Sequence, residues 1–140
     1  MGPRRAVIAT TAYLDASAAV KLLRPEPETS ALRTSLAAIA GHVSSELLEI
    51  ELHCVAHREG GGELIERADR ICAAVDLLPY TAAIRARAGE AFSPPQRALD
   101  ALHLASALDL RLEALVLVTF DERQAQGGRA AGLDALIPTS

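Results

Sequence analysis

The sequence predicts an α/β protein built around a parallel sheet of short strands. Short apolar runs alternate with longer helical patterns along the chain, which is the order of elements in such a sheet. The run at 115–118 is apolar on both faces, as strands covered by helices on both sides are. The chain also holds 28 Ala and 21 Leu among 140 residues, with only 3% aromatic residues, so we expect an aliphatic, helix-rich core.

In the N-terminal half, prolines and glycines separate the expected elements. Prolines at 25 and 27 interrupt the first helix, Gly41 closes the second, and the glycines at 60–62 end the third. Ser44 or Ser45 provides a cap for the third helix. The expected strands cover 12–14 and 42–43, and the expected helices cover 16–23, 29–40, 45–58 and 63–74.

The C-terminal half follows the same alternation. Pro79 closes a strand, Ser93-Pro94-Pro95 is expected to open the longest helix, and Asp121 is expected to begin the last one. The expected strands cover 75–78, 115–118 and 133–137, and the expected helices cover 81–91, 93–110 and 121–131. We therefore expect one domain over residues 1–140, with an ordered core at about 12–137.

Charge and composition exclude several classes of protein. The chain carries 14 basic against 18 acidic residues, a net charge of −4, so no overall positive field attracts nucleic acid or an anionic membrane. Two Phe, two Tyr and no Trp leave little surface on which bases can stack. Half of the residues are apolar and 23% are charged, which argues against disorder. A polyanionic substrate must therefore meet a local arginine patch or bound cations.

The remaining features are typical of a cytoplasmic protein. Cys54 and Cys72 lack the spacing of a disulfide framework or a zinc site, so we expect two buried, reduced thiols. The apolar run after Arg4 and Arg5 is too short and too polar for a signal peptide. We expect no membrane span, because no apolar stretch is long enough to cross a bilayer.

Two aspartates follow strands of the expected sheet. Asp15 comes directly after strand 12–14, and Asp121 follows strand 115–118. In open parallel sheets, sites form beyond the carboxyl ends of the strands, where the loops enter the next helices. Each aspartate taken alone is more simply explained as a helix N-cap. Two such acids at one edge of the sheet favour a site there.

Helix 45–58 places one carboxylate among apolar neighbours. At about 100° per residue, Glu46 and Glu49 lie on a polar arc with the helix's histidines, whereas Glu51 projects from the middle of the apolar arc. A carboxylate that points into a core is costly unless it is paired, hydrogen-bonded or protonated. The alternative to a site is an ion pair between Glu51 and Arg58. The apolar arc comprises Leu47, Leu48, Ile50, Leu52, Cys54 and Val55.

Asp100 presents the same anomaly on a later helix. Between residues 98 and 108 the only polar side chains are Asp100, His103 and Ser106, so this helix is apolar nearly all round and is expected to be buried. Asp100 and His103 are three residues apart and adjacent on the helix surface. The alternative to a site is therefore a buried Asp–His hydrogen bond within the helix.

The four carboxylates are best explained together. Gathered without a cation, they would repel each other and raise each other's pKa. A hard divalent ion such as Mg²⁺ or Mn²⁺ offsets all four costs, because these ions prefer carboxylate and water oxygens. Such an ion also offsets phosphate charge, which explains how a net-acidic chain can bind a phosphodiester. The residues alone thus predict a Mg²⁺ or Mn²⁺ site.

Four segments carry a resemblance to a known family. They are Tyr13-Leu14-Asp15-Ala16-Ser17-Ala18, Val43-Ser44-Ser45 with Glu51-Leu52 downstream, Leu99-Asp100-Ala101-Leu102-His103-Leu104-Ala105, and Val118-Thr119-Phe120-Asp121. In this order and spacing they resemble the PIN domain, and most closely the VapC-type toxins of bacterial toxin–antitoxin pairs, over about residues 12–136. The resemblance implies a compact three-layer α/β/α sandwich and a divalent-metal-dependent endoribonuclease.

The resemblance also implies roles for individual residues. Ser17 and Thr119 match hydroxyl positions of the family and would support the metal site by hydrogen bonds rather than as primary ligands. We hypothesise that a metal-activated water attacks the RNA phosphorus in line and leaves a 5′-phosphate and a 3′-hydroxyl, with one or two ions present. The catalytic and metal-binding residues implied are Asp15, Glu51, Asp100 and Asp121.

Three other functions fit less well. A phosphatase of the haloacid dehalogenase type needs a second acid where this chain has Ser17, and a response-regulator receiver needs a lysine late in the chain, whereas the only lysine is Lys21. The alternative from a different class is a non-catalytic PIN-fold module that serves as a binding scaffold. The presence of all four acids argues against that module.

The resemblance further implies partners. Relatives usually form homodimers and bind a VapB-type antitoxin, a segment of which fills the acidic groove. The apolar stretch at 22–40 is a candidate for part of an antitoxin groove, although burial of a helix explains it equally well. We expect an RNA substrate, which no motif of this chain identifies.

Overall fold

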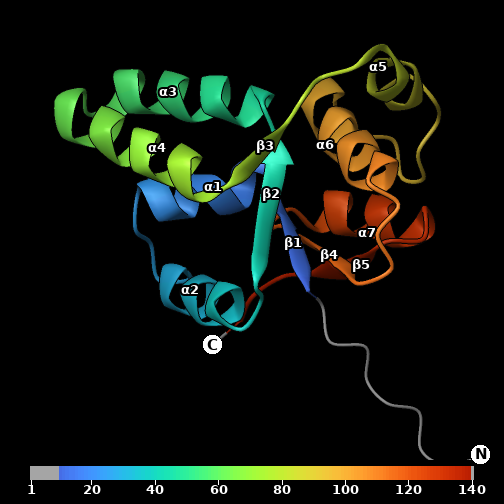
Figure 1. Cartoon of the computed structure of the whole chain (residues 1–140), viewed down its shortest axis with the longest axis horizontal. Coiled ribbons are helices and arrows are strands. Elements are labelled where there is room, and N and C mark those ends of the chain that lie inside the picture. The colour runs from blue at the N-terminus through green and yellow to red at the C-terminus, as the bar shows by residue number, and fades with distance from the viewer. Residues whose placement is uncertain (1–9, 140) are drawn as a thin grey trace, which may run out of the picture.

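A single five-stranded parallel sheet forms the centre of the protein (Figure 1). The structure is a computed structural model that describes residues 10–139; Arg4 and Arg5 are among the residues outside this range. The strand order is β3-β2-β1-β4-β5, and all four pairings are parallel, as the sequence predicts. The strands are β1 (Thr11–Leu14), β2 (Gly41–Ser45), β3 (Asp76–Leu78), β4 (Leu115–Val118) and β5 (Asp134–Leu136).

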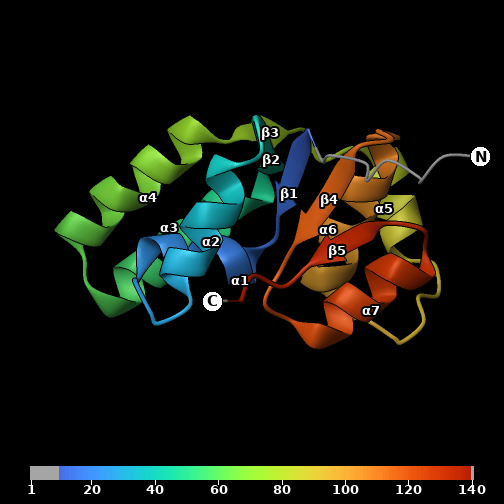
Figure 2. The same ribbon diagram turned by 90° about the horizontal axis from the view of Figure 1, so that it is seen from below.

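Helices cover both faces of this sheet (Figures 1 and 2). On one side lie α1 (Ala16–Leu23), α2 (Thr29–Ala37), α3 (Leu47–Glu59) and α4 (Gly62–Ala74). On the other side lie α5 (Ala82–Ala88), α6 (Ala98–Asp109) and α7 (Glu122–Ala130). The predicted three-layer α/β/α sandwich is therefore confirmed.

Side chains of the central strands alternate between the two helical layers. Ala12 and Leu14 of β1 pack in one buried cluster with residues of α1 and α2. Tyr13 packs in another cluster with Leu104 of α6 and Leu117 of β4. This period of two follows from strand geometry, in which successive side chains point to opposite faces. A third cluster joins α1, α3 and α4 and fixes the outer part of their layer.

The longest predicted helix begins later than expected. The sequence predicts a helix from residue 93, but α6 starts at Ala98. Arg97 before it is extended, with a ψ of 159°, and the Gln96 side chain donates to the carbonyls of Pro94 and Arg123. These bonds tie the segment before α6 to α7, so residues 93–97 form a connection rather than a first helical turn. The body of α6 is buried from Ala101 to Ala107, as predicted.

The predicted apolar arc of α3 is partly wrong. Its buried residues are Leu48, Leu52 and Ala56, whereas Ile50 is 60% exposed and Cys54 is also exposed. The helix packs mainly through one narrow stripe at a spacing of four residues, with Val55 partly buried beside it, whereas Ile50 and Cys54 face solvent. Both cysteines are free thiols, but the expectation that both are buried is wrong.

Glycines let α7 pack close to the sheet. A Cβ atom on Gly128 would lie 3.0 Å from Cδ2 of Leu117 and 3.5 Å from Cδ2 of Leu104. Glycine inside a helix costs roughly 0.5–1 kcal/mol relative to alanine. Here the missing side chain makes room for two fully buried leucines. Within residues 10–139, no helix has the length and apolar character needed to cross a bilayer.

We expect the Leu117→Ala variant to lose about 2–5 kcal/mol in free energy of unfolding, because it leaves a cavity between β4, α6 and α7. Leu112→Ala is the matched control, since the same atoms are removed from a side chain that is 48% exposed. Urea denaturation followed by circular dichroism measures both. A loss for Leu117→Ala no larger than that of the control would show that this cluster is not the core that holds the layers together.

Candidate active site at the carboxyl edge of the sheet

Asp15 lies at the carboxyl end of β1 and is only 1% exposed. Its Oδ1 accepts hydrogen bonds from the Ala18 amide at 2.9 Å and from the Ser17 hydroxyl at 2.7 Å. Its Oδ2 accepts from the Thr119 hydroxyl. The N-cap explanation for Asp15 is therefore confirmed. The same carboxylate also connects the loops that follow β1 and β4.

Asp121 begins α7 two residues beyond that threonine. Its Oδ1 accepts from the Gln124 amide at 3.1 Å, so it too is a helix N-cap. The Asp121 amide donates to the Thr119 hydroxyl oxygen, and the Phe120 amide donates to the Ser17 hydroxyl oxygen. Ser17 and Thr119 thus hold the turn after β4 against Asp15, a position compatible with their predicted supporting role.

Asp100 and Asp121 border one polar cavity of about 570 Å³. Two arginines, Arg97 and Arg123, line it as well. The Gln124 side chain donates to the Asp100 carbonyl and so joins the first turns of α6 and α7. Across residues 10–139, the Asp100 carboxylate accepts no hydrogen bond from the protein, and the Asp100–His103 bond that was the alternative to a site does not form, because His103 bonds to Tyr13 and Glu51. The Asp100 carboxylate can therefore bind a cation that enters the cavity.

Glu51 is bound by a residue that the sequence did not assign to it. Its Oε1 lies 2.7 Å from Nε2 of His103, and its side chain is 16% exposed. The alternative partner, Arg58, is exposed and forms no ion pair with it. His103 is three residues from Asp100 on α6, so one helix carries one acid and holds another. A histidine inside an otherwise apolar helix is a signal for such a bond, but it does not identify the partner.

Burial and like charge act on these carboxyls. Burial raises the pKa of Asp15 above its ordinary value, and the bonds from Thr119, Ala18 and Ser17 partly oppose this. The pKa of Asp100 is also raised, first by burial and then by the charge of Asp121, while His103 lowers it. Glu51 adds a smaller upward effect on the Asp100 pKa. The charges of two other predicted acids, Asp121 and Glu51, therefore reach the Asp100 carboxyl.

The four acids gather at one edge but do not converge on one point. Among residues 10–139, no three His, Cys, Asp or Glu side chains lie close enough together to hold one metal ion. Both Asp15 oxygens already accept hydrogen bonds, and Glu51 is bound to His103. Asp100 and Asp121 have unpaired carboxylate oxygens that face the polar cavity. Their oxygen chemistry fits a hard divalent ion that retains several waters.

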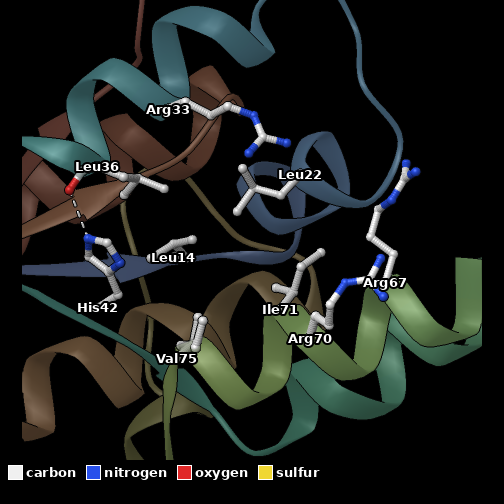
Figure 3. Close-up of a pocket in the computed structure, with 10 residues that line it drawn as sticks. Leu14, Leu22, Arg33, Leu36, His42, Arg67, Arg70, Ile71 and Val75 are labelled. Carbon is white, nitrogen blue, oxygen red and sulfur yellow. Dashed lines mark hydrogen bonds between the residues drawn. The ribbon is translucent and has the colours of Figure 1, made fainter.

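A second cavity, of about 360 Å³, lies between α2 and α4 and has a different character (Figure 3). Apolar side chains form its floor, and Arg33, Arg67 and Arg70 surround it (Figure 3). The His42 ring bonds to the carbonyls of Leu36 and Ile39 at its end. We call this cavity the arginine groove; its lining residues are Leu14, Leu22, Arg33, Leu36, His42, Arg67, Arg70, Ile71, Ala74 and Val75.

Comparisons with known proteins agree with this architecture. The model of the PIN domain family matches residues 12–129. The chain is 38% identical to ribonuclease VapC47 of Mycobacterium tuberculosis over 130 residues, which cover 90% of this chain and 96% of that protein. It is 35% identical to ribonuclease VapC46 of the same species over 127 residues, which cover 91% of this chain and 97% of that protein.

Solved structures share the fold at low sequence identity. The Mycobacterium tuberculosis toxin VapC20, described as cleaving the sarcin–ricin loop, superposes with a TM-score of 0.72 at 17% identity and covers 91% of this chain and 99% of its own. VapBC2 of Rickettsia felis, bound to a promoter DNA fragment, gives a TM-score of 0.70 at 16% identity and covers 90% and 97%. With the matched family model and relatives of 35–38% identity, the chain belongs to the PIN domain family, among its VapC members.

Proposed function

We propose that this protein is a toxin endoribonuclease that hydrolyses RNA phosphodiesters at the edge where its acids gather. One observation carries the proposal: the unpaired oxygens of Asp100 and Asp121 face a single polar cavity that two arginines also line. Relatives at 35–38% identity are named ribonuclease VapC, which supports RNA as the substrate. We also propose that the reaction takes place in the cytoplasm.

A divalent cation, Mg²⁺ or Mn²⁺, is the cofactor we propose for this cavity. Asp100 and Asp121 would hold it directly, and Asp15 and Glu51 would act through water or as additional ligands. The bound ion would supply a nucleophilic water and offset phosphate charge. Ser17 and Thr119 keep Asp15 in place by donating to its two oxygens.

Residues around the acids would position the RNA. Arg97 and Arg123 line the same cavity and offer guanidinium groups to phosphate oxygens, with which they can form paired hydrogen bonds. Water adds to phosphorus while the bond from phosphorus to the 3′-oxygen breaks, so the products carry a 5′-phosphate and a 3′-hydroxyl. These ends distinguish hydrolysis from cleavage by the neighbouring 2′-hydroxyl.

We propose that a VapB-type antitoxin docks in the arginine groove. Leu22, Arg33 and Leu36 of the predicted apolar stretch line this groove, beside Arg67 and Arg70 of α4. An apolar floor within a basic rim fits a partner segment that carries both apolar and acidic side chains. Solved structures with this fold include a VapBC complex and FitAB bound to DNA, which supports an antitoxin as a partner of this chain.

Two further interpretations remain open to experiment. We propose a homodimer, which sedimentation velocity of the purified toxin tests directly. The alternative function is a scaffold that binds partners without catalysis. It would be favoured if the protein bound Mn²⁺ but left RNA intact.

We expect Asp100→Asn and Asp121→Asn each to reduce cleavage of RNA in Mn²⁺ by at least about 100-fold, because each removes a charge that the cation requires. Asp109→Asn, an exposed change on α6, is the control and is expected to cleave at the wild-type rate. Gel analysis of total RNA with 5′-end sequencing measures the rate and the product ends. Full activity of Asp100→Asn, or of the wild type in EDTA, would refute a metal-dependent site here.

We expect Asp100→Asn to stabilise the metal-free protein at pH 7 by up to about 1 kcal/mol, the scale of interactions between partly exposed charges. The pKa of Asp100 is raised in the folded state, so its ionised form destabilises the fold and stability falls as pH rises through that pKa. The gain should vanish in acid, where wild-type Asp100 is also neutral. Thermal melts with and without Mn²⁺ test this, and the variant should lose the stabilisation by Mn²⁺.

We expect the double change Arg33→Glu with Arg70→Glu to weaken antitoxin binding by about 10-fold or more. Both side chains border the groove, and neither forms an ion pair among residues 10–139. The double change Arg85→Glu with Arg87→Glu on α5, in the opposite helical layer, is the charge-matched control. Isothermal titration with the cognate antitoxin measures both, and RNA cleavage by free toxin should be unaffected. Equal affinities would place the antitoxin elsewhere.

A further inference from the structure

Three side chains from three elements form a hydrogen-bonded line that ends at Glu51, one of the four predicted acids. Tyr13 of β1 places its hydroxyl 2.8 Å from Nδ1 of His103, and Nε2 of the same ring lies 2.7 Å from Oε1 of Glu51. The Tyr13 and His103 rings meet edge to face, with centroids 5.7 Å apart. Tyr13 is fully buried and His103 is 1% exposed. Both ring nitrogens of His103 are therefore occupied inside the protein.

The Glu51 end of this line places a proton on the His103 ring. An ionised carboxylate can only accept hydrogen bonds, so Nε2 of His103 must carry a proton to bond with Glu51. A neutral ring then accepts the Tyr13 hydroxyl proton at Nδ1, and a protonated ring donates from Nδ1 to the hydroxyl oxygen, so the 2.8 Å contact suits both states. Burial raises the pKa of Tyr13 well above its ordinary value, so this hydroxyl keeps its proton. Each group in the line thus has a partner of the correct type.

Glu51 depends on this line for its position. Its helix, α3, is anchored through Leu48, Leu52 and Ala56 in a cluster with α1 and α4. Asp100 and His103, in contrast, belong to α6 on the other side of the sheet. Among residues 10–139, the bond from His103 is the only hydrogen bond of the Glu51 side chain. Without it, a long and flexible carboxylate would be free to sample several rotamers.

We propose that His103 is a positioning residue that fixes the Glu51 carboxylate against α6, the helix that carries Asp100, and that Tyr13 fixes the His103 ring for this task. The inference rests on the proposed function, in which Glu51 belongs to the cation-binding acids. Partners that orient the ligands of a metal typically change metal affinity or activity by about 10–100-fold when they are removed. A purely structural network would change stability without acting through Glu51.

A double-mutant cycle with Mn²⁺ as the probe tests this. We expect His103→Leu to weaken Mn²⁺ binding by about 10–100-fold, and His103→Gln, whose amide can still donate to Glu51, to lose less. In a Glu51→Gln background, His103→Leu should weaken Mn²⁺ binding little further, because the effect of His103 on the cation passes through the glutamate. On an RNA that the wild type cleaves, kcat should fall while KM stays unchanged.

Helix α3, which carries Glu51, also supplies a matched control. His53 of α3 also bonds to a carboxylate, Asp69, at 2.7 Å, but Asp69 is not one of the four predicted acids. His53→Leu removes the same kind of bond and is expected to leave Mn²⁺ binding and kcat unchanged. Urea denaturation confirms that each variant is folded. If His103→Leu does not fold, Tyr13→Phe and His103→Gln carry the test.

A readout independent of catalysis separates this inference from the proposed function. We expect histidine-selective ¹⁵N spectra of the metal-free protein to show that Nε2 of His103 carries a proton. A ring that lacks the proton at Nε2 would overturn the inference. Folded His103 variants that bind Mn²⁺ like the wild type, or that lose affinity equally with and without Glu51, would also overturn it while leaving the ribonuclease proposal intact. A wild type that neither binds Mn²⁺ nor cleaves RNA would refute both.

Discussion

The buried carboxylate of Asp15 fixes the edge of the sheet on which the site is built. Because it has almost no access to water, each of its oxygens needs donors from the protein. The hydroxyls of Ser17 and Thr119 supply two of them, and each hydroxyl oxygen in turn accepts an amide from the turn after β4. One buried charge therefore fixes where α1 begins, how the chain leaves β4, and where Asp121 starts α7.

The sequence predicted those parts of the molecule that depend on local pattern. The parallel sheet, its short strands and the four exceptional carboxylates are all recognisable from apolar runs and isolated charges. The partner of Glu51 was not predictable in the same way, because α3 and α6 meet only in the folded chain and periodicity gives a face without its neighbour. The prediction of where α6 starts was wrong for a related reason, since the Gln96 side chain bonds to a carbonyl of α7 that lies 27 residues away.

Charge is distributed so that a net-acidic chain presents two chemically opposite surfaces. At the carboxyl edge of the sheet, burial and then the charge of Asp121 raise the pKa of Asp100, so a bound cation would stabilise this edge. The arginine groove gathers Arg33, Arg67 and Arg70 above apolar residues, an arrangement that favours binding of an acidic segment. Net charge describes neither surface, because screening confines each interaction to its own neighbourhood. An overall value of −4 is thus compatible with both an RNA substrate and an acidic partner.

Strand β1 connects these surfaces through three consecutive residues. Tyr13 points towards α6 and bonds to His103, Leu14 points to the opposite face and lines the arginine groove, and Asp15 ends the strand in the cap. Alternation along a strand makes this arrangement a matter of register, since a shift by one residue would exchange the two faces. Pairing of Tyr13 with Leu117 and of Leu14 with Val118 fixes that register in the middle of the sheet. The most central strand of the fold is therefore also the element on which the acids, the histidine and the groove all depend.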